Sequence, residues 1–588
     1  MDIQEKIGSR SGMTTIQADR PLPSTRLLWV TVLAVALLYI WGLDNLYMPS
    51  NGDEMVYAHI ARLTATSSQW LPLVSDLNDM RNTKPPLLFW QSMVVSGWGE
   101  YWQLWLLRVP SLVYLGLVCA GMSLLLHRWL GEWRTAAWAV LCLLLSWGTF
   151  RYGRPYLTTA PEMFWFGLAP AWVLWRAAQP STRGIHHTVS EWFAWTVLGL
   201  LTGLGLAYKS FALIAPLAAA TWAMRLALQP RWSWRDLAVC TTQTLWLSMV
   251  AVAVFATWLL LDPQPQEVWR EFVQRENAGK MSSNQSYLSV LFSLKGSGDY
   301  LAAPLLNTGL LFPWVLALVA IGWRFVRVHG WVLRGGLAMA LWLWIAVWCL
   351  VFMLPSQRSA RYLLPLMPAL AMLMAMHAEK FSAGVARGTG LLSLLALAVL
   401  CWLAWHAHSL GILPMAWALC VALAGLGVVV LCVAMWRSLD QAAIQSLWCA
   451  ALFLLGLNAL LQGMSGERVR FQGSMADRPI AETVWVTEGF NGEFERLQFL
   501  LPGHNRFVPQ QVKLNALIDG TERTSGTWFI VPRLMNDPPL ACEAQHICER
   551  VAVRWDIEQR LKPGQVHAGN MWRPNEWLWR QEWLLRVR

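Results

Sequence analysis

The chain has 588 residues, of which 56% are hydrophobic and only 14% are charged. Soluble domains carry about a quarter charged residues, so this composition excludes an ordinary soluble protein and indicates an integral membrane protein. The net charge of +11 comes from lysines and arginines dispersed between apolar runs rather than gathered on one face, which excludes a nucleic-acid-binding surface.

The first apolar run covers residues 27–47 and follows a polar, basic tail over residues 1–26. No small-residue cleavage site follows it, so we predict an uncleaved anchor whose N-terminal tail lies in the cytoplasm. Further runs are long enough to cross a hydrocarbon core of roughly 30 Å, and they bring the predicted number of spans to about thirteen. These runs lie near residues 104–126, 136–150, 163–175, 192–208, 211–228, 237–261, 304–323, 335–354, 363–377, 389–405, 417–436 and 444–464.

The loops between these runs predict the orientation of the helices. Cytoplasmic loops carry an excess of Lys and Arg, and short basic loops such as HRWLGEWR and RLALQPRWSWR fit that side. Two loops on the opposite side, at 48–103 and 262–303, are too long to be simple connections. We therefore predict a transmembrane domain over 27–464 with two large periplasmic loops, followed by a periplasmic domain over 465–588.

The tail over 465–588 has a different character from the rest of the chain. Runs such as ETVWVTEG and GTWFIVPRL alternate with Gly, Pro and Asn, which predicts a small α/β domain. Cys542 and Cys548 lie in this tail, whereas the other cysteines lie within apolar runs. An oxidising compartment favours a disulfide between these two. The predicted fold is thus a polytopic α-helical membrane protein with a C-terminal α/β domain.

Two acids stand at the outer end of the first span, in SNGDEMVYAHIARL. Asp53 and Glu54 fall in the first turn of a predicted helix, where acids are favoured by the helix dipole. That effect, about 0.3 to 1 kcal/mol, could alone explain Glu54. Asp53 needs a further explanation, because several cations are predicted to reach the same membrane surface.

The predicted outer loops carry these cations. In RNTKPPLLFW, two prolines fix the start of a helix and aim Lys84 at the interface. Lys209 stands between two apolar runs with almost no loop, a costly position unless an anion pairs with it or it snorkels to the interface. The positive-inside rule places Lys and Arg mainly in cytoplasmic loops, so a group of cations in the outer loops runs against it. We therefore expect these cations to have a function, most simply the binding of a lipid phosphate. The predicted set is Lys84, Arg154, Lys209, Lys280, Arg358 and Arg361.

Five sequence pieces occur in an order and spacing typical of one enzyme family. They are DE, KPPLLFW, a Lys in a Gly-rich span, RENAGK and ARYLLPLMPAL. Over residues 27–464 the chain resembles the aminoarabinose (lipid A) transferases and related polyprenyl-phosphate-dependent GT-C glycosyltransferases. The resemblance implies a bacterial inner-membrane enzyme that takes a sugar from an undecaprenyl-phosphate carrier. It would transfer the sugar to lipid A or another envelope lipid or glycan at the periplasmic face, as a monomer surrounded by membrane lipids and without a cofactor.

The resemblance also implies roles for individual residues. Asp53 matches the family's catalytic acid, with Glu54 beside it, and Lys84 matches the Lys of the Lys-Pro-Pro motif. The remaining residues that would contact donor phosphate or substrate are Arg154, Lys209, Lys280, Arg358, Arg361 and Tyr362.

The chain departs from the family pattern at two positions. Relatives often have an Asp where Thr159 stands, and Glu162, one helical turn later, could replace it as a catalytic acid. Aminoarabinose transferases commonly have a metal-binding Glu where Thr83 stands, so no metal is expected here.

The chemistry of sugar transfer explains why this family needs such residues. Breaking the bond between sugar C1 and phosphate builds negative charge, which fixed cations in a water-poor groove stabilise. A carboxylate would act as general base on an acceptor hydroxyl or stabilise a cationic sugar, and in-line attack would invert the anomeric carbon. Two alternatives stay open. One is the same chemistry on protein Ser or Thr or on an O-antigen glycan, and the other is a lipid-linked glycan transporter, which buried cations also suit.

Overall fold

A computed structural model gives the fold of the chain. The residues that it describes are 23–46, 53–75, 81–179, 188–229, 233–280, 298–329, 336–355, 358–438, 441–464, 483–487, 493–500, 506–510, 528–535, 537, 546–555 and 569–587. Cys542 lies outside these ranges, and so do the atoms of the Cys548 side chain, so the expected disulfide stays a prediction.

The described part of the chain up to residue 464 is built almost entirely from helices. It begins with α1 (Thr25–Ile40), α2 (Asp53–Thr66), α3 (Leu87–Val95), α4 (Leu104–Leu130), α5 (Trp133–Leu144), α6 (Trp147–Gly153), α7 (Thr159–Ala177), α8 (Val189–Leu206), η2 (Phe211–Leu213), α9 (Ile214–Ala227) and α10 (Trp234–Leu261). It continues with α11 (Pro265–Val268), the π-helix η3 (Trp269–Asn277), η4 (Ala278–Lys280), α13 (Asp299–Leu301), α14 (Ala303–Thr308), η6 (Gly309–Leu311), α15 (Phe312–His329), α16 (Leu337–Phe352), η7 (Ala360–Leu366), α17 (Met367–His377), η8 (Ala378–Lys380), α18 (Ala383–Ser409), α19 (Met415–Arg437) and α20 (Ala442–Met464).

The helices confirm a polytopic membrane protein. Within the described ranges, eight helical segments are long and apolar enough to cross a membrane, judged by length and composition. Four other apolar helices, α1, α5, α16 and the segment Phe211–Ala227, are shorter. Each segment expected to span overlaps helix, but α1 ends at Ile40, before the end of the run expected at 27–47. The runs expected at 136–150, 304–323 and 363–377 are each divided between shorter helices. The number of about thirteen crossings stays a prediction.

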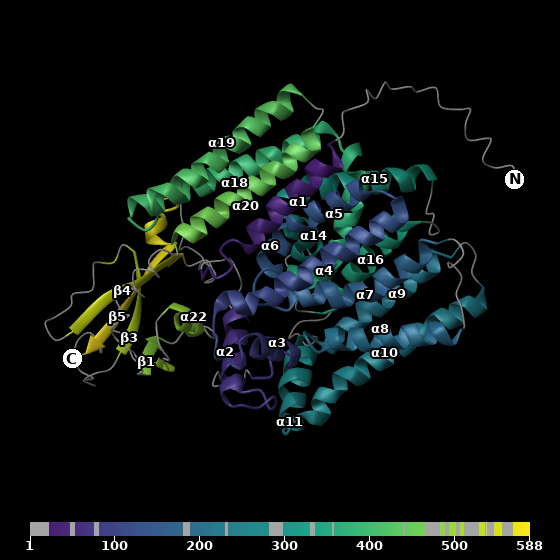
Figure 1. The fold of residues 1–588 in the computed structure, drawn as a ribbon, viewed down its shortest axis with the longest axis horizontal. Coiled ribbons are helices and arrows are strands. Elements are labelled where there is room, and N and C mark those ends of the chain that lie inside the picture. The colour runs from purple at the N-terminus through teal and green to yellow at the C-terminus, as the bar shows by residue number, and fades with distance from the viewer. Residues whose placement is uncertain are drawn as a thin grey trace.

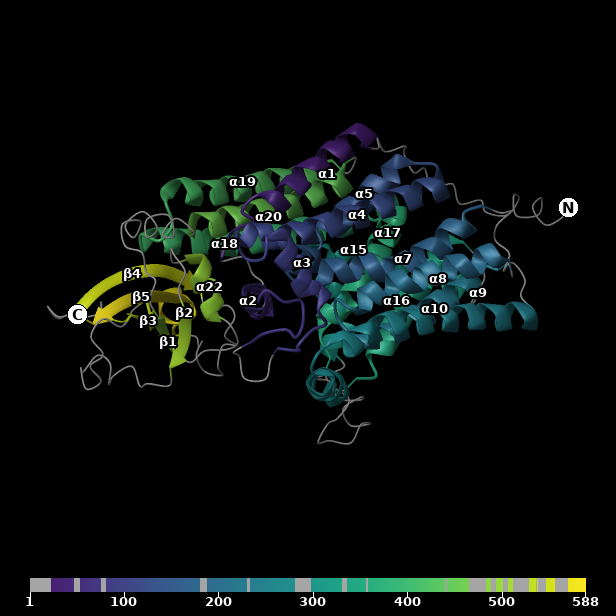
Figure 2. The same ribbon diagram turned by 60° about the horizontal axis from the view of Figure 1, so that its bottom comes forward.

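The helices pack in layers around a buried centre. In Figures 1 and 2, α18, α19 and α20 form one flank, α8, α9 and α10 form the opposite flank, and α1, α4, α5 and α7 lie between them. The segment containing η7 and α17 has 78% of its apolar window buried, whereas the figure for α19 is 22%. A span hidden by its neighbours on most sides belongs to the core of a bundle, and one exposed on most sides faces lipid. The segment η7, which contains Arg361, the last of the predicted cations, therefore leads into the centre of the molecule.

The C-terminal region contains a small mixed sheet, as expected. Its strands are β1 (Thr483–Thr487), β2 (Arg506–Gln510), β3 (Trp528–Leu534), β4 (His546–Trp555) and β5 (Trp579–Val587), with the helix α22 (Glu493–Leu500) after β1. The strand order is β2-β1-β3-β5-β4. β1 pairs in parallel with β2 and β3, whereas β5 pairs antiparallel with β3 and β4. The expected domain boundary at residue 465 falls outside the described residues.

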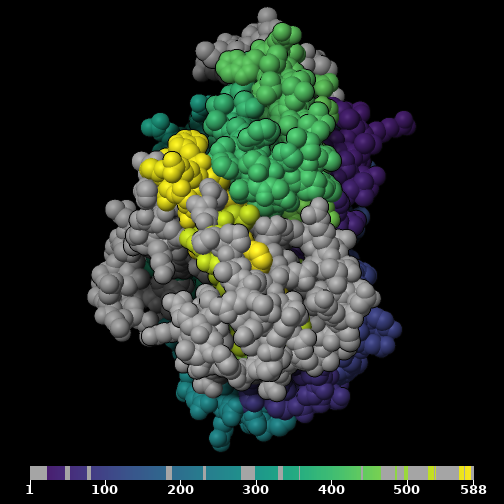
Figure 3. All heavy atoms as spheres, turned by 90° about the vertical axis from the view of Figure 1, so that its left-hand side faces the viewer, coloured from purple at the N-terminus to yellow at the C-terminus, as the bar shows by residue number. Residues whose placement is uncertain are grey.

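The sheet is attached to the helical part at two places. In Figure 1, α22 lies between the sheet and α2, and apolar side chains of all three share one buried cluster. Figure 3 shows C-terminal residues, in yellow, against the green helices. One contact there is between Trp572 and Trp402 on α18, whose rings pack edge to face with their centroids 5.9 Å apart. The helix α2 therefore connects the helical part with the sheet.

Helices α8 and α10 approach each other closely because of two glycines. A Cβ atom added at Gly199 would lie 2.8 Å from the Cβ of Val250, and one added at Gly203 would lie 2.5 Å from the Cβ of Val254. Glycines four residues apart on one helix face allow this close contact in membranes, where packing rather than the hydrophobic effect holds helices together.

We predict that Gly203→Ala lowers the thermal stability of the detergent-solubilised protein, because the new methyl group must push α8 from α10 at a cost of about 1 to 3 kcal/mol. Gly167→Ala is the control, since nothing lies within 4 Å of a Cβ atom at that helical position. It should leave the melting temperature unchanged or raise it. Equal melting temperatures for the two variants would contradict this account of the contact.

Candidate active site

The first residue of α2 forms an ion pair with the segment that leads into α17. The Oδ2 atom of Asp53 lies 2.8 Å from Nη2 of Arg361, which belongs to η7. The Ser359 side chain accepts a hydrogen bond from the Arg361 backbone N–H and so caps η7. The side chains of Asp53 and Arg361 are 32% and 17% exposed, so the pair is accessible from solvent. A carboxylate and a guanidinium are thus held together where both side chains are partly exposed.

A second ion pair lies nearby. The Nζ atom of Lys209, just after α8, lies 2.9 Å from Oε1 of Glu162 and donates to the Thr158 hydroxyl at 3.0 Å. The same ammonium lies 5.8 Å from the ring centroid of Tyr362, the residue that follows Arg361. Lys209 therefore has the anionic partner that its position between two apolar runs requires.

Lys84 reaches the same region from the turn before α3. Its Nζ donates to the Thr83 carbonyl at 2.7 Å and lies 5.7 Å from the centroid of the Tyr57 ring on α2. The helix begins at Leu87, directly after the two prolines, as expected. The Leu87 backbone N–H donates to the carbonyl of Ala207, so the turn is tied to the end of α8 close to Lys209.

The buried Tyr57 shows that these groups share one electrostatic environment. Burial raises the pKa of its hydroxyl well above the ordinary value, and the nearby charge of Asp53 raises it further, whereas Arg361 opposes the shift. Glu276 and Glu162 also raise this pKa. The phenol therefore stays protonated at neutral pH and can donate a hydrogen bond. We call the following set the acid–cation cluster: Asp53, Tyr57, Lys84, Glu162, Lys209, Arg361 and Tyr362.

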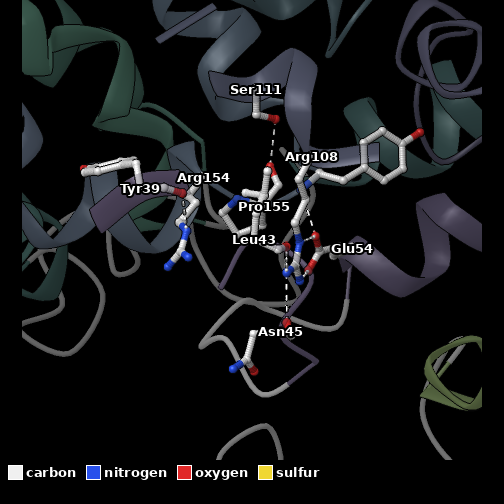
Figure 4. Close-up of polar contacts among 9 residues, drawn as sticks. Tyr39, Leu43, Asn45, Glu54, Arg108, Ser111, Arg154 and Pro155 are labelled. Atoms are coloured by element: carbon white, nitrogen blue, oxygen red, sulfur yellow. Dashed lines mark hydrogen bonds and ion pairs between the residues drawn. The ribbon is translucent and has the colours of Figure 1, made fainter. Parts of the chain in front are cut away.

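Glu54 does not join the acid–cation cluster, although it follows Asp53 directly. Its carboxylate forms a buried bidentate ion pair with Arg108 on α4 (Figure 4). Nε of Arg108 donates to Oε1 at 2.7 Å, and Nη2 donates to Oε2 at 2.9 Å. Glu54 also accepts from the backbone N–H of Tyr156 at 2.8 Å, and the remaining Arg108 donor bonds the carbonyls of Leu43 and Asn45. This carboxylate is 0% exposed, and its bonds to Arg108 and Tyr156 give it a structural role, so a catalytic role of Glu54 stays a prediction.

Arg154 is the second residue that the structure places elsewhere. Its guanidinium donates to the Tyr39 carbonyl at 2.9 Å, to the carbonyl of Trp41, and to Oδ1 of Asn458 on α20 at 2.9 Å. Figure 4 shows it beside Tyr39, on the far side of Pro155 from Arg108. Arg154 is buried and holds α6, α1 and α20 together, and the expected contact with donor phosphate stays a prediction.

The other expected residues lie at the edge of the described region. Arg358 donates through Nε to the Pro355 carbonyl at 3.0 Å. Lys280 is the last residue of η4, and its side chain lies outside the description. Within the described ranges, no three His, Cys, Asp or Glu side chains are grouped in a way that could hold a metal ion.

The opposite end of α2 is held by the C-terminal region. Glu495 on α22 is completely buried, and its carboxylate accepts from Nε and Nη2 of Arg62, both at 2.8 Å. It also lies 2.8 Å from Nδ1 of His59. Burial alone would raise the pKa of Glu495, but the hydrogen bonds from Arg62 and His59 outweigh it and hold the pKa below the ordinary value. The helix that carries Asp53 is thus fixed to α22 by a charged contact.

Sequence reasoning missed several of these residues. Arg108 could have been found, because an arginine inside the apolar run LWLLRVPSLV needs a buried acceptor. Glu276 stands in the RENAGK piece and was passed over in favour of the nearby lysine. Glu495 offered no signal, since an acid in a polar tail is ordinarily solvated.

We predict that Glu54→Gln strongly destabilises the protein. It leaves the Arg108 charge buried without its counter-ion, and removing one partner of such a pair costs about 3 to 5 kcal/mol. Thermal unfolding in detergent measures the loss. Glu576→Gln is the control, since Glu576 pairs with Arg573, whose side chain is 69% exposed, and such pairs contribute at most about 1 kcal/mol. A similar loss in both variants would show that burial of the Glu54 pair is unimportant.

We predict that α2 loosens in acid. Because the folded pKa of Glu495 lies below its ordinary value of about 4.3, its contribution is complete above that pH and is lost as pH falls through the folded pKa. Hydrogen exchange of α2, corrected for intrinsic rates, should show protection that falls with pH in the wild type. Glu495→Gln should start less protected and change less over the same range. Parallel curves for the two proteins would exclude this carboxylate as the cause.

Comparison with known proteins adds to this geometry. No family model matches the chain. The chain is 27% identical over 367 residues to undecaprenyl phosphate-α-4-amino-4-deoxy-L-arabinose arabinosyl transferase 1 of Sodalis glossinidius, covering 60% of this chain and 59% of that protein. It is 28% identical over 395 residues to the corresponding transferase of Pseudomonas aeruginosa, covering 63% and 64%. The chain thus matches less than two thirds of the length of these relatives.

Solved structures show the fold. The crystal structure of ArnT from Cupriavidus metallidurans bound to undecaprenyl phosphate superposes with a TM-score of 0.56 at 17% identity, covering 86% of this chain and 93% of that one. The same protein in the apo state gives a TM-score of 0.55 at 16% identity. The chain is therefore a multi-pass membrane protein whose fold is similar to that of ArnT.

Proposed function

We propose that the chain is an inverting glycosyltransferase of the bacterial inner membrane. It would move a sugar from an undecaprenyl-phosphate carrier to lipid A or another envelope lipid or glycan. The observation that carries this proposal is the acid–cation cluster, in which Asp53 and Arg361 form an accessible pair beside Lys84 and Lys209. The likeness in sequence to arabinosyl transferases and in fold to ArnT supports it. In this proposal the chain acts as a monomer.

The cations of the cluster would bind the donor phosphate. Lys84 and Arg361 approach from two different segments, and Lys209 lies close to Tyr362 next to Arg361. As the bond between sugar C1 and the phosphate oxygen stretches, negative charge grows on the leaving phosphate, and each fixed donor can lower the barrier by about 3 to 4 kcal/mol. The ion pairs with Asp53 and Glu162 hold two of these cations in place before substrate arrives.

Asp53 would act on the opposite side of the sugar. When Arg361 turns to the phosphate, the Asp53 carboxylate becomes available as a general base. It takes the proton of an acceptor hydroxyl while the acceptor oxygen bonds to C1 and undecaprenyl phosphate leaves. If the acceptor is a phosphate of lipid A, no proton needs to move, and Asp53 instead stabilises the positive charge that develops on the sugar ring. In-line attack inverts C1 in both cases.

We place this reaction at the periplasmic face. The helix α2, which begins with Asp53, lies beside α22 and the sheet (Figure 2). The basic loops favour the cytoplasm for the other end of the bundle. In this proposal residues 1–26 are a cytoplasmic tail, 27–464 form the transmembrane catalytic domain, and 465–588 form a periplasmic domain. Lys280 and Arg358 would flank the donor site, and Cys542 and Cys548 would form a disulfide.

We predict that Asp53→Asn leaves the protein folded but lowers sugar transfer by about 100-fold or more, because the variant cannot accept a proton. Purified protein in detergent would be given undecaprenyl-phosphate-linked sugar and lipid A, and mass spectrometry would detect the addition of one sugar. Asp236→Asn is the control, since Asp236 also lies in the first turn of a helix, in the capping box of α10.

Two outcomes oppose the proposal. Equal activity of Asp53→Asn and Asp236→Asn would make Asp53 only a helix-capping acid. Sugar-linked lipid that crosses vesicle membranes, with no transfer in detergent to lipid A, glycan or protein, would make the chain a transporter.

A further inference from the structure

The turn before Lys84 contains buried polar atoms that have no partner. Asn82 is 1% exposed, and neither its side-chain oxygen nor its side-chain nitrogen has a hydrogen-bond partner. Thr83 is 7% exposed, and its hydroxyl also has no hydrogen-bond partner. Three polar side-chain atoms in two consecutive residues are thus removed from water without compensation.

Such a concentration is unusual, because the large majority of buried polar side-chain atoms have a partner. In the part of the chain that the structure describes, no other side-chain amide has both of its polar atoms buried without a partner. An uncompensated polar group in the interior costs free energy, so each one in a native structure calls for an explanation. A ligand that supplies the missing hydrogen bonds is one such explanation.

The unpaired side-chain atoms of Asn82 and Thr83 do not hold the turn in position. Arg81 bonds Gln264 and Glu267 beside α11, and the Asn82 backbone N–H donates to Oε2 of Glu271 on η3 at 3.3 Å. On the other side, Leu87 is tied to the end of α8. Backbone and neighbouring contacts therefore hold the turn, and the Asn82 amide and Thr83 hydroxyl remain free to serve a bound molecule.

The position of the turn indicates which molecule this is. Lys84 is the next residue, and its ammonium donates back to the Thr83 carbonyl at 2.7 Å. A phosphate bound by Lys84 would bring the group attached to it close to Asn82 and Thr83. Phosphate oxygens only accept at neutral pH, so they cannot satisfy the amide oxygen of Asn82, which needs a donor. A polyprenyl chain has no polar atoms at all. A hydroxyl both donates and accepts, and a sugar carries several.

We propose that Asn82 and Thr83 form a subsite that binds the hydroxyl groups of the donor sugar and so selects it. This inference rests on the proposed glycosyltransferase function. The amide oxygen of Asn82 would accept from one sugar hydroxyl, while its amide nitrogen and the Thr83 hydroxyl would donate to others. A site built to bond a hydroxyl rejects an analogue that lacks it, because the buried groups are then left unpaired again.

Thr83→Val tests the subsite, because valine keeps the shape of threonine and removes the unpaired hydroxyl. In the absence of ligand, the variant should melt at the same or a higher temperature than the wild type. Undecaprenyl phosphate alone should raise the melting temperature of both proteins equally. The sugar-linked donor should stabilise the variant less than the wild type, and kcat/KM for that donor should fall about tenfold or more. Thr83→Ser, which keeps a hydroxyl, should recover most of the loss.

Thr389→Val is the matched control. Thr389 lies on α18, is buried like Thr83, and also has a hydroxyl without a partner. This variant should likewise keep or raise the melting temperature, but its response to the sugar-linked donor should equal that of the wild type. A common effect of both substitutions on donor use would show that the change is general and not due to a subsite.

Three results would overturn the inference. A lower melting temperature of unliganded Thr83→Val would give the hydroxyl a structural role. Equal responses of wild type and Thr83→Val to the sugar-linked donor, with the wild type turning over, would remove the subsite and leave the proposed function standing. Failure of the wild type to respond to any undecaprenyl-phosphate-linked sugar would remove both.

Discussion

The arrangement of the candidate site depends on the buried pair between Glu54 and Arg108. This pair fixes where α2 begins and how it is rotated, because the Glu54 carboxylate meets two guanidinium donors and one backbone N–H. Neighbouring residues on a helix point about 100° apart, so a Glu54 held inward turns Asp53 to a different side. There Asp53 meets Arg361. Taking both charges from water is costly, and the complete set of hydrogen bonds around Arg108 is what makes the arrangement tolerable.

The helix α2 then relates two distant parts of the chain. Its first residue contributes to the acid–cation cluster, and its second half is held by Glu495 through His59 and Arg62. A helix of 14 residues is short and stiff, so a shift of α22 would move Asp53 at the other end of α2. The C-terminal region is thereby part of the structure that positions the carboxylate, although it contributes no member of the cluster.

The two sides of the site differ in how well their polar groups are satisfied. On the cluster side, two of the cations are paired with acids, which compensates their charges. On the side of the turn at Asn82 and Thr83, polar atoms are buried without compensation. A bound molecule with a phosphate at one end and hydroxyls at the other matches this difference. The phosphate would replace the acids as partner of the cations, and the hydroxyls would satisfy the turn.

The sequence alone determined the class of the fold and predicted several charged residues of the candidate site. Long apolar runs require helices in a membrane, Gly and Pro between short β-rich runs predicted the terminal sheet, and cations in outer loops pointed to Asp53, Lys84, Lys209 and Arg361. Only the tertiary structure decided which acid or arginine faces the site. Helical periodicity tells which residues share a face, but not which face meets a partner 54 residues away, as with Glu54 and Arg108. The burial of Glu495, and of the Asn82 side-chain amide without a partner, likewise follows from long-range packing that no local pattern records.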